Sequence, residues 1–191
     1  MDSSSTKHFS FSGKGIFPHR WAFTLLIPLR STKRLIQRLE LKPNSNVLEI
    51  GPGPGYFSVK IAKFLTEGRL TLADIQQEML DHAKKRLVKR KLHNVDYYLC
   101  DGEQFALPDS GFDTIFMVMV LGEVVHKENY IRECLRMLKP GGNLSISEQS
   151  GDPDKLPMAD VRLLIESAGF VFDKIYGKEN DYTINFIKPS E

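Results

Sequence analysis

The sequence predicts an α/β protein in which helices cover both faces of a mostly parallel sheet. Short runs of β-forming residues alternate with helical segments along the chain, the order that such a sheet requires. Residues 112–119 are almost wholly apolar, as is typical of a strand buried on both faces. The β-forming run at residues 47–50 is cut off by glycines at alternate positions, where a tight loop leads into a helix.

Residues 1–30 are expected to form a flexible N-terminal segment before a single domain at residues 31–191. The first 14 residues are rich in Ser, Gly and Lys, which disfavours a packed core. Residues 17–30 hold the only Trp among apolar residues and flanking arginines. This stretch is predicted to dock on the core or to close over a functional site as a lid, and a transient contact with a membrane surface is a third interpretation.

The domain is expected to begin with a helix that Ser31 caps and that runs to about residue 40. Its apolar residues Leu35, Ile36 and Leu39 share one face. The turn at residues 43–45 then leads into the first strand.

Gly51, Gly53 and Gly55 form the loop after that strand. Glycine suits a loop that must adopt backbone angles side chains resist and must let a ligand approach the main chain. Alternating glycines alone are a weak signal, but this spacing lacks the third glycine of the dinucleotide-binding pattern. In addition, Glu49 lies in the strand just before the loop, where a carboxylate would repel a pyrophosphate and favour a ligand with a cationic centre.

A second strand at residues 70–74 ends on Asp74. This acid lies about 20 positions beyond the glycine loop, where α/β nucleotide-binding folds place a carboxylate on the ribose hydroxyls. Asp74 is therefore the most informative polar residue of the sequence. The alternative is that Asp74 only caps the next helix.

The third strand, at residues 95–100, follows a helix at residues 76–91 that carries a run of Lys and Arg on its outer side. A solvated helix face explains this run better than a nucleic-acid contact, because the net charge of the chain is only +2. Asp101 and Gly102 come directly after the third strand.

The remaining elements complete the alternation. The fourth strand, residues 112–119, is followed by a helix at residues 128–138, which Lys139-Pro140-Gly141-Gly142 is expected to break, and then by a fifth strand at residues 143–148. A helix at residues 158–168 leads to strands at residues 170–176 and 182–188. The short turn between the last two strands makes them antiparallel.

Composition narrows the class of protein. With 191 residues, 41% of them hydrophobic and 26% charged, the chain is expected to be one globular domain. Cys100 and Cys134 are expected to be buried free thiols, and without a signal peptide before them the expected location is the reducing cytoplasm. No apolar stretch is long enough to span a bilayer, and the five His residues show no metal-ligand spacing.

The pattern Glu49-x-Gly51-x-Gly53-x-Gly55 resembles motif I of the class I S-adenosylmethionine-dependent methyltransferases. Four further landmarks of that family occur in order: Asp74, Asp101-Gly102, Leu107-Pro108 with Gly111-Phe112-Asp113, and Leu138-Lys139-Pro140-Gly141-Gly142. The resemblance implies a Rossmann-like, doubly wound, seven-stranded sheet of order 3-2-1-4-5-7-6 with strand 7 antiparallel. It implies a cytoplasmic enzyme, a monomer or homodimer, with S-adenosylmethionine as cofactor and S-adenosylhomocysteine as product.

By the same resemblance, Asp74 would bind both ribose hydroxyls, and Asp101 with the amide of Gly102 would read the adenine. The main chain around Met117 would hold the methionine portion of the cofactor. The cofactor-binding residues that the resemblance implies are Glu49, Gly51, Pro52, Gly53, Gly55, Asp74, Ile75, Met79, Asp101, Gly102 and Met117.

Residues for the methyl acceptor are harder to assign. Displacement at a sulfonium methyl needs alignment and exclusion of water, with a base only for some acceptors. The catalytic candidates are Glu123 and His126 after the fourth strand, although His126 also suits a helix start. The substrate candidates are Tyr56 at the start of the loop helix, with His19 and Trp21 from the N-terminal segment.

Within the family, the loop and landmarks look most like those of the quinone-biosynthesis C-methyltransferases. Few residues separate Glu148 from the next helix, where larger relatives insert substrate-binding elements. An acceptor site left open in this way would suit a bulky, lipidic or macromolecular substrate, or closure by residues 17–29. The leading expectation is a small-molecule acceptor, lipidic or aromatic. The alternatives are a non-catalytic cofactor-binding subunit, a nucleic-acid or protein methyltransferase and an NAD-dependent oxidoreductase. The missing Asn/Asp-Pro-Pro-aromatic motif after the fourth strand argues against methylation of a base amine, so a nucleic-acid partner is not expected.

Overall fold

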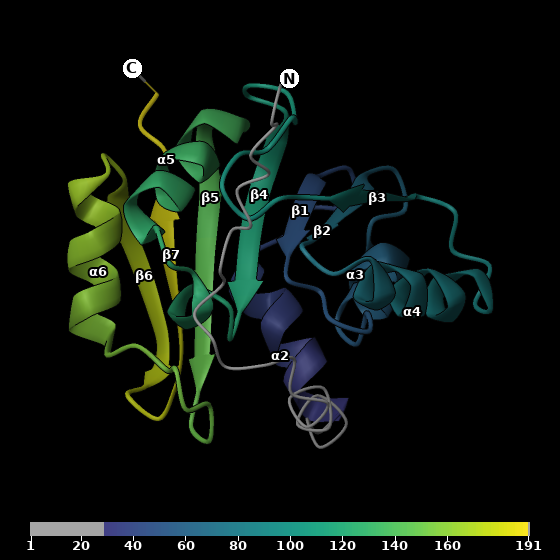
Figure 1. Ribbon diagram of the computed structural model, residues 1–191, viewed down its shortest axis with the longest axis horizontal. Helices are drawn as coiled ribbons and strands as arrows, with labels where there is room; N and C mark the ends of the chain where they lie inside the picture. Colours follow the sequence, from purple (N-terminus) through teal and green to yellow (C-terminus); the bar gives the residue numbers. More distant parts are fainter. Residues whose placement is uncertain (1–28, 191) are drawn as a thin grey trace, which may run out of the picture.

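The computed structural model describes residues 29–190, which form one seven-stranded sheet in the order β3-β2-β1-β4-β5-β7-β6 (Figure 1). The strands are β1 (Asn46–Ile50), β2 (Arg69–Asp74), β3 (Val95–Leu99), β4 (Phe112–Val118), β5 (Leu138–Gln149), β6 (Val171–Lys178) and β7 (Asp181–Ile187). β1 to β5 pair in parallel, whereas β7 runs antiparallel to both β5 and β6. The predicted fold class and strand order are confirmed.

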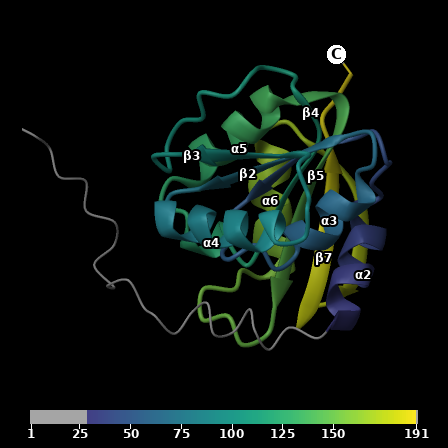
Figure 2. The same ribbon diagram turned by 90° about the vertical axis from the view of Figure 1, so that its right-hand side faces the viewer.

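The helices form two layers, one on each face of the sheet. They are α2 (Leu29–Leu39), α3 (Ser58–Phe64), α4 (Gln77–Val88), α5 (Lys127–Met137) and α6 (Met158–Ser167), with the 3₁₀ turn η1 (Leu121–Glu123) between β4 and α5. Figure 2 looks onto the side of α4 and shows α3 and α4 in front of the strands, with α6 behind them.

Each layer closes its own apolar core. One core packs α2, α3 and α4 against Val47, Leu72 and Phe116 of the sheet, and the other packs α5 and α6 against Leu48, Ile115 and Ile146. Successive residues of a strand point to opposite faces, so the apolar run of β4 serves both cores. This burial explains why that strand lacks alternating polar residues.

The first helix begins earlier than expected. It starts at Leu29, so Ser31 lies inside the helix and is not its cap. Pro28 directly precedes Leu29, and proline is compatible with the start of a helix but not with its interior. Leu35 and Leu39 are buried as predicted.

The fifth strand also differs from its prediction. β5 already begins at Leu138, which pairs with Phe112, and the regular register resumes only where Asn143 pairs with Thr114. Lys139-Pro140-Gly141-Gly142 thus forms an irregularity within the strand, a place that tolerates the missing amide of a proline. The helix before this strand does end there, as expected.

The last two strands are joined by a shorter turn than expected. Lys178 and Asp181 still pair with each other, which leaves two residues between β6 and β7. Gly177, expected in the turn, belongs to β6 with a φ of 92°.

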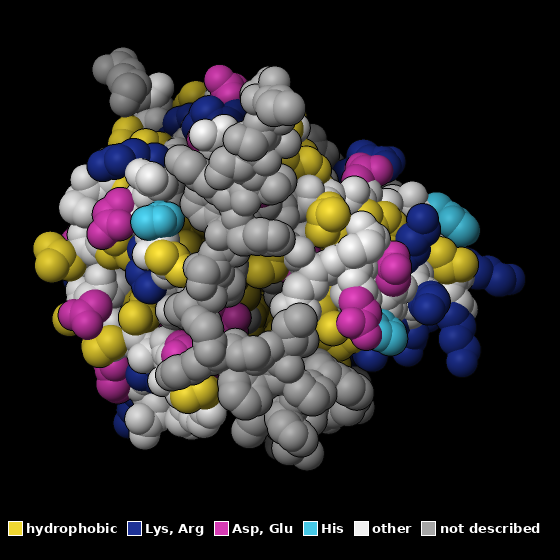
Figure 3. Space-filling view, in the orientation of Figure 1, with side chains coloured by type: hydrophobic (Ala, Val, Ile, Leu, Met, Phe, Trp, Pro, Cys, Tyr) yellow, Lys and Arg dark blue, Asp and Glu magenta, His cyan; other side chains and the backbone are white. Residues whose placement is uncertain are grey.

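The predicted basic run lies on the surface. Figure 3 shows Lys and Arg side chains grouped around the end of the molecule formed by α4. The exposed members are Lys84, Lys85, Lys89, Arg90 and Lys91. Across residues 29–190, no helix has the length and apolar character to cross a membrane, and no group of side chains has the make-up of a metal site.

Candidate active site

The glycine loop lies between β1 and α3. Gly51, Gly53 and Gly55 adopt φ angles of 68°, 52° and 75°, which lie in the left-handed region that only glycine enters without cost. The Gly51 amide donates to the carbonyl of Ala73 at 2.8 Å, and the Gly55 amide donates to the carbonyl of Pro52 at 3.0 Å. The loop is therefore tied to the end of β2 and closed on itself.

The three glycines meet different surroundings. A Cβ at Gly51 would lie 2.4 Å from Cγ2 of Val120, and one at Gly55 would lie 2.9 Å from the Cβ of Ala83. Apart from the neighbours of Gly53 in the chain, no atom of the described residues lies within 4 Å of the place where a Cβ of Gly53 would stand. The middle of the loop thus faces open space, into which a ligand can approach the main chain, while its two ends are packed against the protein.

Glu49 is buried below this loop, 2% exposed, and accepts a hydrogen bond from the hydroxyl of Ser58 at 2.6 Å. Burial raises the pKa of Glu49 to about 8, and nearby Asp74 adds to this rise while Ser58 opposes it. The sequence predicts a carboxylate at this position. In the ligand-free protein at neutral pH its neutral form is favoured, and a cationic ligand nearby would shift the group toward the carboxylate.

Asp74 ends β2 beside the loop and is 8% exposed. Its Oδ1 accepts the amide of Gln76 at 3.0 Å. Burial raises the pKa of Asp74, whereas the amides of Gln76, Gly53 and Ile75 favour its ionised form. The carboxyl group thus lies within reach of the loop amides, at the edge where the carboxyl ends of β1 and β2 meet.

An apolar surface continues from Asp74 toward β3. Ile75 is 36% exposed and Leu99, which pairs with Asp74 in the sheet, is 50% exposed. Met79 is half-buried nearby in sequence, on α4. Such a surface suits the flat face of an adenine. Leu99 was missed from the sequence, where it was read only as a strand residue.

Asp101 and Gly102 follow β3 in an exposed turn. Oδ1 of Asp101 accepts the amides of Glu103 at 2.9 Å and Gln104 at 3.0 Å, and these amides hold the pKa of Asp101 below its usual range. Gly102 has a φ of 86°. The carboxylate is thus fixed by its own turn; its role in binding adenine stays a prediction.

These groups fit the cofactor that the sequence resemblance implies. A carboxyl group at the end of β2 can accept two ribose hydroxyls, the open side of Gly53 can receive the ligand, and Glu49 can balance a positive charge. Met117 is fully buried and pairs with Ile50 of β1 and Ile146 of β5, so its main chain belongs to the sheet. The next two residues, with Met119 at a φ of 56°, carry the chain to Val120 and so to the loop.

The expected acceptor residues belong to different elements of the fold. Tyr56 packs edge to face on Phe57 with ring centres 5.2 Å apart. Glu123 ends η1, and His126 is the exposed N-cap residue of α5, whose side chain makes no cap hydrogen bond. The catalytic role of Glu123 and His126 stays a prediction. His19 and Trp21, with the proposed lid, lie outside the described residues.

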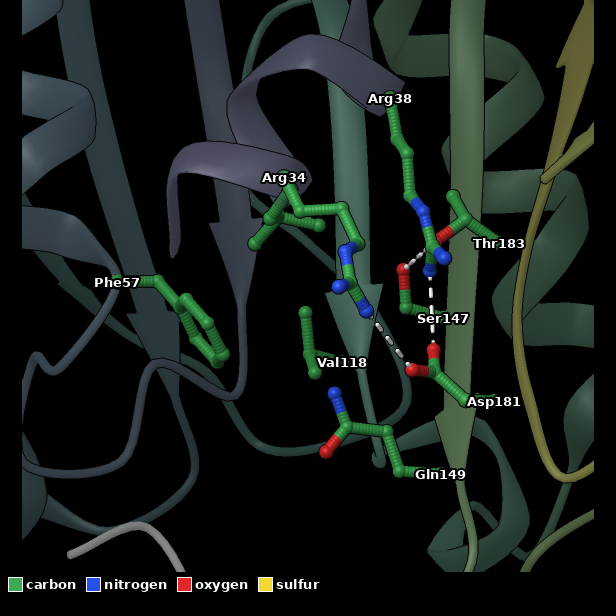
Figure 4. A pocket seen from close by; sticks show the side chains of 9 residues that line it. Arg34, Arg38, Phe57, Val118, Ser147, Gln149, Asp181 and Thr183 are labelled. Carbon is green, nitrogen blue, oxygen red and sulfur yellow. Dashed lines mark hydrogen bonds and ion pairs between the residues drawn. The ribbon is translucent and has the colours of Figure 1, made fainter. Parts of the chain in front are cut away.

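A small pocket opens between α2 and the ends of β4, β5 and β7 (Figure 4). Arg38 donates to Asp181 at 3.0 Å and to the Thr183 hydroxyl at 3.1 Å, and Thr183 is 2.8 Å from the hydroxyl of Ser147. The cavity volume is about 20 Å³, room for about one water. This polar network fastens α2 to the sheet and holds no acceptor in the described conformation.

A larger cavity of about 410 Å³ lies at the opposite edge of the sheet. Asn44, Thr114, Lys139 and Asn143 help to line it, at the amino ends of the strands, and no residue of the glycine loop does so. Parallel α/β sheets bind ligands outside the carboxyl ends of their strands. The size of this cavity therefore does not make it the active site.

A second buried acid at the carboxyl edge escaped the sequence analysis. Glu148 of β5 is fully buried, and neither carboxyl oxygen has a hydrogen-bond partner within the described part of the chain. The only sequence signal is an acid near the end of an apolar strand, which does not tell burial from exposure.

Comparison with known sequences places this geometry in a family. The profile of a methyltransferase domain family matches residues 47–142. The ubiquinone/menaquinone biosynthesis C-methyltransferase UbiE of Pseudomonas entomophila is 32% identical over 140 residues, which is 72% of this chain and 53% of that protein. UbiE of Ectopseudomonas mendocina is 37% identical over 117 residues, 59% of this chain and 46% of that protein. The chain spans about half the length of these curated relatives.

Solved structures share the fold. An S-adenosylmethionine-dependent methyltransferase of Aquifex aeolicus aligns with a TM-score of 0.79 at 24% identity, over 91% of this chain and all of the other. The [4+2]-cyclase SpnF aligns with a TM-score of 0.73 at 21% identity, over 85% of this chain and 82% of the other. At such identities the likeness shows the fold alone, and a cyclase among the neighbours shows that the fold does not decide the reaction.

Proposed function

The chain belongs to the class I S-adenosylmethionine-dependent methyltransferases, and we propose that it transfers the methyl group of this cofactor to a small, apolar or aromatic acceptor. The observation that carries the proposal is the pairing of an open Gly53 with the buried carboxyl of Asp74 at one edge of the sheet. The carboxyl of Asp74 suits a ligand with two neighbouring hydroxyl groups, and the open loop at Gly53 suits a charged ligand that approaches the main chain. A pyrophosphate would not be attracted by the nearby carboxyl of Glu49.

The residues of this chain bind and orient the cofactor. Asp74 accepts the ribose hydroxyls, Ile75 and Leu99 cover the adenine, and the loop amides near Gly53 approach the methionine portion. The bound cofactor supplies an electrophilic methyl group on a sulfonium. Glu49, as a carboxylate in the loaded site, offsets the positive charge, and the buried Ser58 hydroxyl keeps its orientation.

The acceptor class is supported by the named activity of the relatives and by the surroundings of the site. The UbiE proteins are C-methyltransferases of ubiquinone and menaquinone biosynthesis, whose ring substrates are apolar. Val118, Met119 and Val120, where β4 meets the loop, form an apolar border. An acceptor of similar chemistry, a phenol or hydroquinone, fits this border better than a nucleic acid does. Tyr56, Glu123 and His126 are proposed to line the acceptor side.

Calorimetric titration with S-adenosylmethionine, S-adenosylhomocysteine and NAD in parallel tests the cofactor. We expect saturable binding of the first two and none of NAD. Methyl transfer is then assayed with a panel of phenols and hydroquinones against amines and oligonucleotides. Binding of NAD alone would indicate that the protein is a dehydrogenase. Binding of S-adenosylmethionine without turnover on any acceptor would favour a non-catalytic subunit.

A further inference from the structure

Glu148 is a buried acid whose carboxyl group has no hydrogen-bond partner among the described residues. Its side chain is fully buried, and among residues 29–190 neither carboxyl oxygen has a hydrogen-bond partner. A buried polar group without a partner costs free energy, and native proteins retain few of them. A ligand that supplies the missing hydrogen bond would account for such a group. The position of Glu148 relative to the candidate active site is therefore informative.

That place is the carboxyl edge of the sheet. Ser147 of β5 pairs with Val118, the last residue of β4, and its carbonyl accepts the amide of Met119 at 2.9 Å. Glu148 is the next residue, so it lies just beyond the end of β4, at the edge where Val120 meets the glycine loop. Because Ser147 faces α2, Glu148 points to the other face, toward the core of α5 and α6.

The charges around Glu148 do not neutralise it. Burial raises the pKa of Glu148 to about 8, Asp152 and Glu123 add to the rise, and Lys155 opposes it. Lys155 itself donates to Glu179 at 3.2 Å. The hydroxyl of Tyr182, which pairs with Glu148 in the sheet, is bound to the carbonyl of Leu156 at 2.5 Å. The titratable and charged groups that face this region are Glu123, Asp152, Lys155, Asp160, Glu179 and Tyr182.

The segment after Glu148 has no regular structure. Residues 150–157 contain no helix or strand, and Gly151 adopts a φ of 95° with no atom within 4 Å of its missing side chain. This segment touches η1 closely, since a Cβ at Gly122 would lie 1.9 Å from the carbonyl oxygen of Asp154. The contact joins the 3₁₀ helix η1 to a loop without regular structure, which is held to the β6–β7 turn and β7 by the Ser150 amide on the Asn180 carbonyl and by the Tyr182 hydroxyl on the Leu156 carbonyl.

We propose that Glu148 is a catalytic residue that contacts the methyl acceptor and takes the proton of a hydroxyl group on its ring. The inference rests on the proposed methyl transfer to a phenol or hydroquinone and adds the residue that recognises the hydroxyl group of that acceptor. A hydroxyl group supplies the donor that both oxygens of Glu148 lack. Residues 150–157 move aside to admit the ring.

The proton transfer balances with methylation of a ring carbon. Glu148, as a carboxylate, takes the O–H proton, and the electron pair left on oxygen makes the ring carbon nucleophilic. That carbon forms the bond to the methyl group as the methyl–sulfur bond breaks, with its electron pair staying on sulfur. The ring C–H proton then leaves to water and Glu148 returns its proton to the oxygen, so that one proton is released per turnover. An acid whose pKa lies near neutrality suits this task.

A binding comparison tests the contact without turnover. The probes are 1-naphthol and 1-methoxynaphthalene, which differ in the donor hydrogen, titrated into the full chain with and without S-adenosylhomocysteine. We expect the protein to bind 1-naphthol at least tenfold more tightly and Glu148→Leu to bind both probes equally. Glu166→Gln, an exposed acid on α6, serves as the matched control and should keep the preference. A protein without this preference, or a Glu148→Leu variant that keeps it, would overturn the proposal.

A rate measurement tests the proton transfer. Glu148→Gln keeps the shape of the side chain, so we expect its affinity for S-adenosylhomocysteine to change less than twofold while kcat/KM on phenols falls at least 100-fold. The rise of the wild-type rate between pH 6 and 9 should also vanish. Unchanged kinetics in Glu148→Gln would refute the inference. If the wild type neither binds the cofactor nor turns over, the proposed function fails. The naphthol comparison still tests whether Glu148 binds a hydroxyl group, because it does not depend on turnover.

Discussion

Two buried acids at the same edge of the sheet differ in what surrounds them. Glu49 on β1 and Glu148 on β5 are both nearly or fully buried, and burial raises the pKa of each to about 8. Glu49 accepts the Ser58 hydroxyl at 2.6 Å, whereas neither oxygen of Glu148 has a partner. They face opposite layers of helices.

The difference divides the candidate site into a finished half, whose acids already accept hydrogen bonds from the protein, and an unfinished half, whose acid Glu148 accepts none from the described residues. On the side of β1 to β3, the protein supplies hydrogen bonds to Glu49, Asp74 and Asp101 before any ligand binds. A preorganised half of this kind suits a ligand of constant structure, such as a cofactor. On the side of β5 the partner of Glu148 is missing, which suits a group that arrives with the acceptor.

The largest expected effect is on the finished half. We expect Asp74→Ala to weaken binding of S-adenosylhomocysteine by a factor of about 10² to 10³, because two hydrogen bonds to a charged acceptor are lost. Binding of 1-naphthol by Glu148 should persist. Calorimetry measures both affinities, and Asp96→Ala, which removes an exposed ion pair with Arg69, is the control. Cofactor affinity unchanged in Asp74→Ala would remove Asp74 from the site.

A pair of loop variants separates packing from ligand approach. Gly51→Ala should destabilise the protein by about 2 to 4 kcal/mol, because its Cβ would meet Val120 at 2.4 Å in a backbone conformation that side chains resist. Gly53→Ala meets open space, so we expect about 1 kcal/mol from the backbone alone, with a larger loss in cofactor affinity. Urea unfolding and calorimetry on both variants give the two numbers. Equal stability of the two would contradict the open side of Gly53.

Ser58→Ala makes Glu49 resemble Glu148. The substitution removes the hydrogen bond from Ser58 to the Glu49 carboxyl and leaves that carboxyl buried. We therefore expect a loss of about 1 to 3 kcal/mol in the free energy of unfolding. The pKa of Glu49 should rise further, because the Ser58 hydrogen bond lowers it. Urea unfolding at pH 6 measures the loss. Val59→Ala, beside Ser58 in α3 and half-buried, controls for simple truncation. If Ser58→Ala is as stable as the wild type, the hydrogen bond to Glu49 does not distinguish it energetically from Glu148.

The last prediction concerns the pH dependence of stability. The pKa of Glu148 is about 8 in the folded protein against an ordinary value of 4.5, so the unfolded chain releases this proton first as the pH rises. The free energy of unfolding therefore falls between about pH 4.5 and 8, by at most about 1.4 kcal/mol per pH unit for one group. Glu148→Gln should show a shallower fall than the wild type in urea midpoints at pH 5 to 8. Identical slopes would mean that Glu148 titrates normally.

The elements and the conformation of the glycine loop were largely predictable from the sequence, because the signals are local. The alternation of helices and strands follows from residue spacing within each segment. Gly51, Gly53 and Gly55 signal a strained loop in one short stretch, and Asp74 is marked by its distance along the chain from that loop. The resemblance of five ordered landmarks to one family added the strand order.

The acceptor half could not be predicted, because its properties depend on segments that meet only in the fold. The neutral state favoured for Glu49 comes from burial against α3, and the isolation of Glu148 comes from the packing of β5, η1 and residues 150–157 around it. The early start of β5 at Leu138 likewise reflects pairing with β4 rather than local propensity. The sequence by itself determined which residues could bind a cofactor; the tertiary structure alone decided which buried acid was left without a partner, since burial and hydrogen bonding are set by residues distant in the chain.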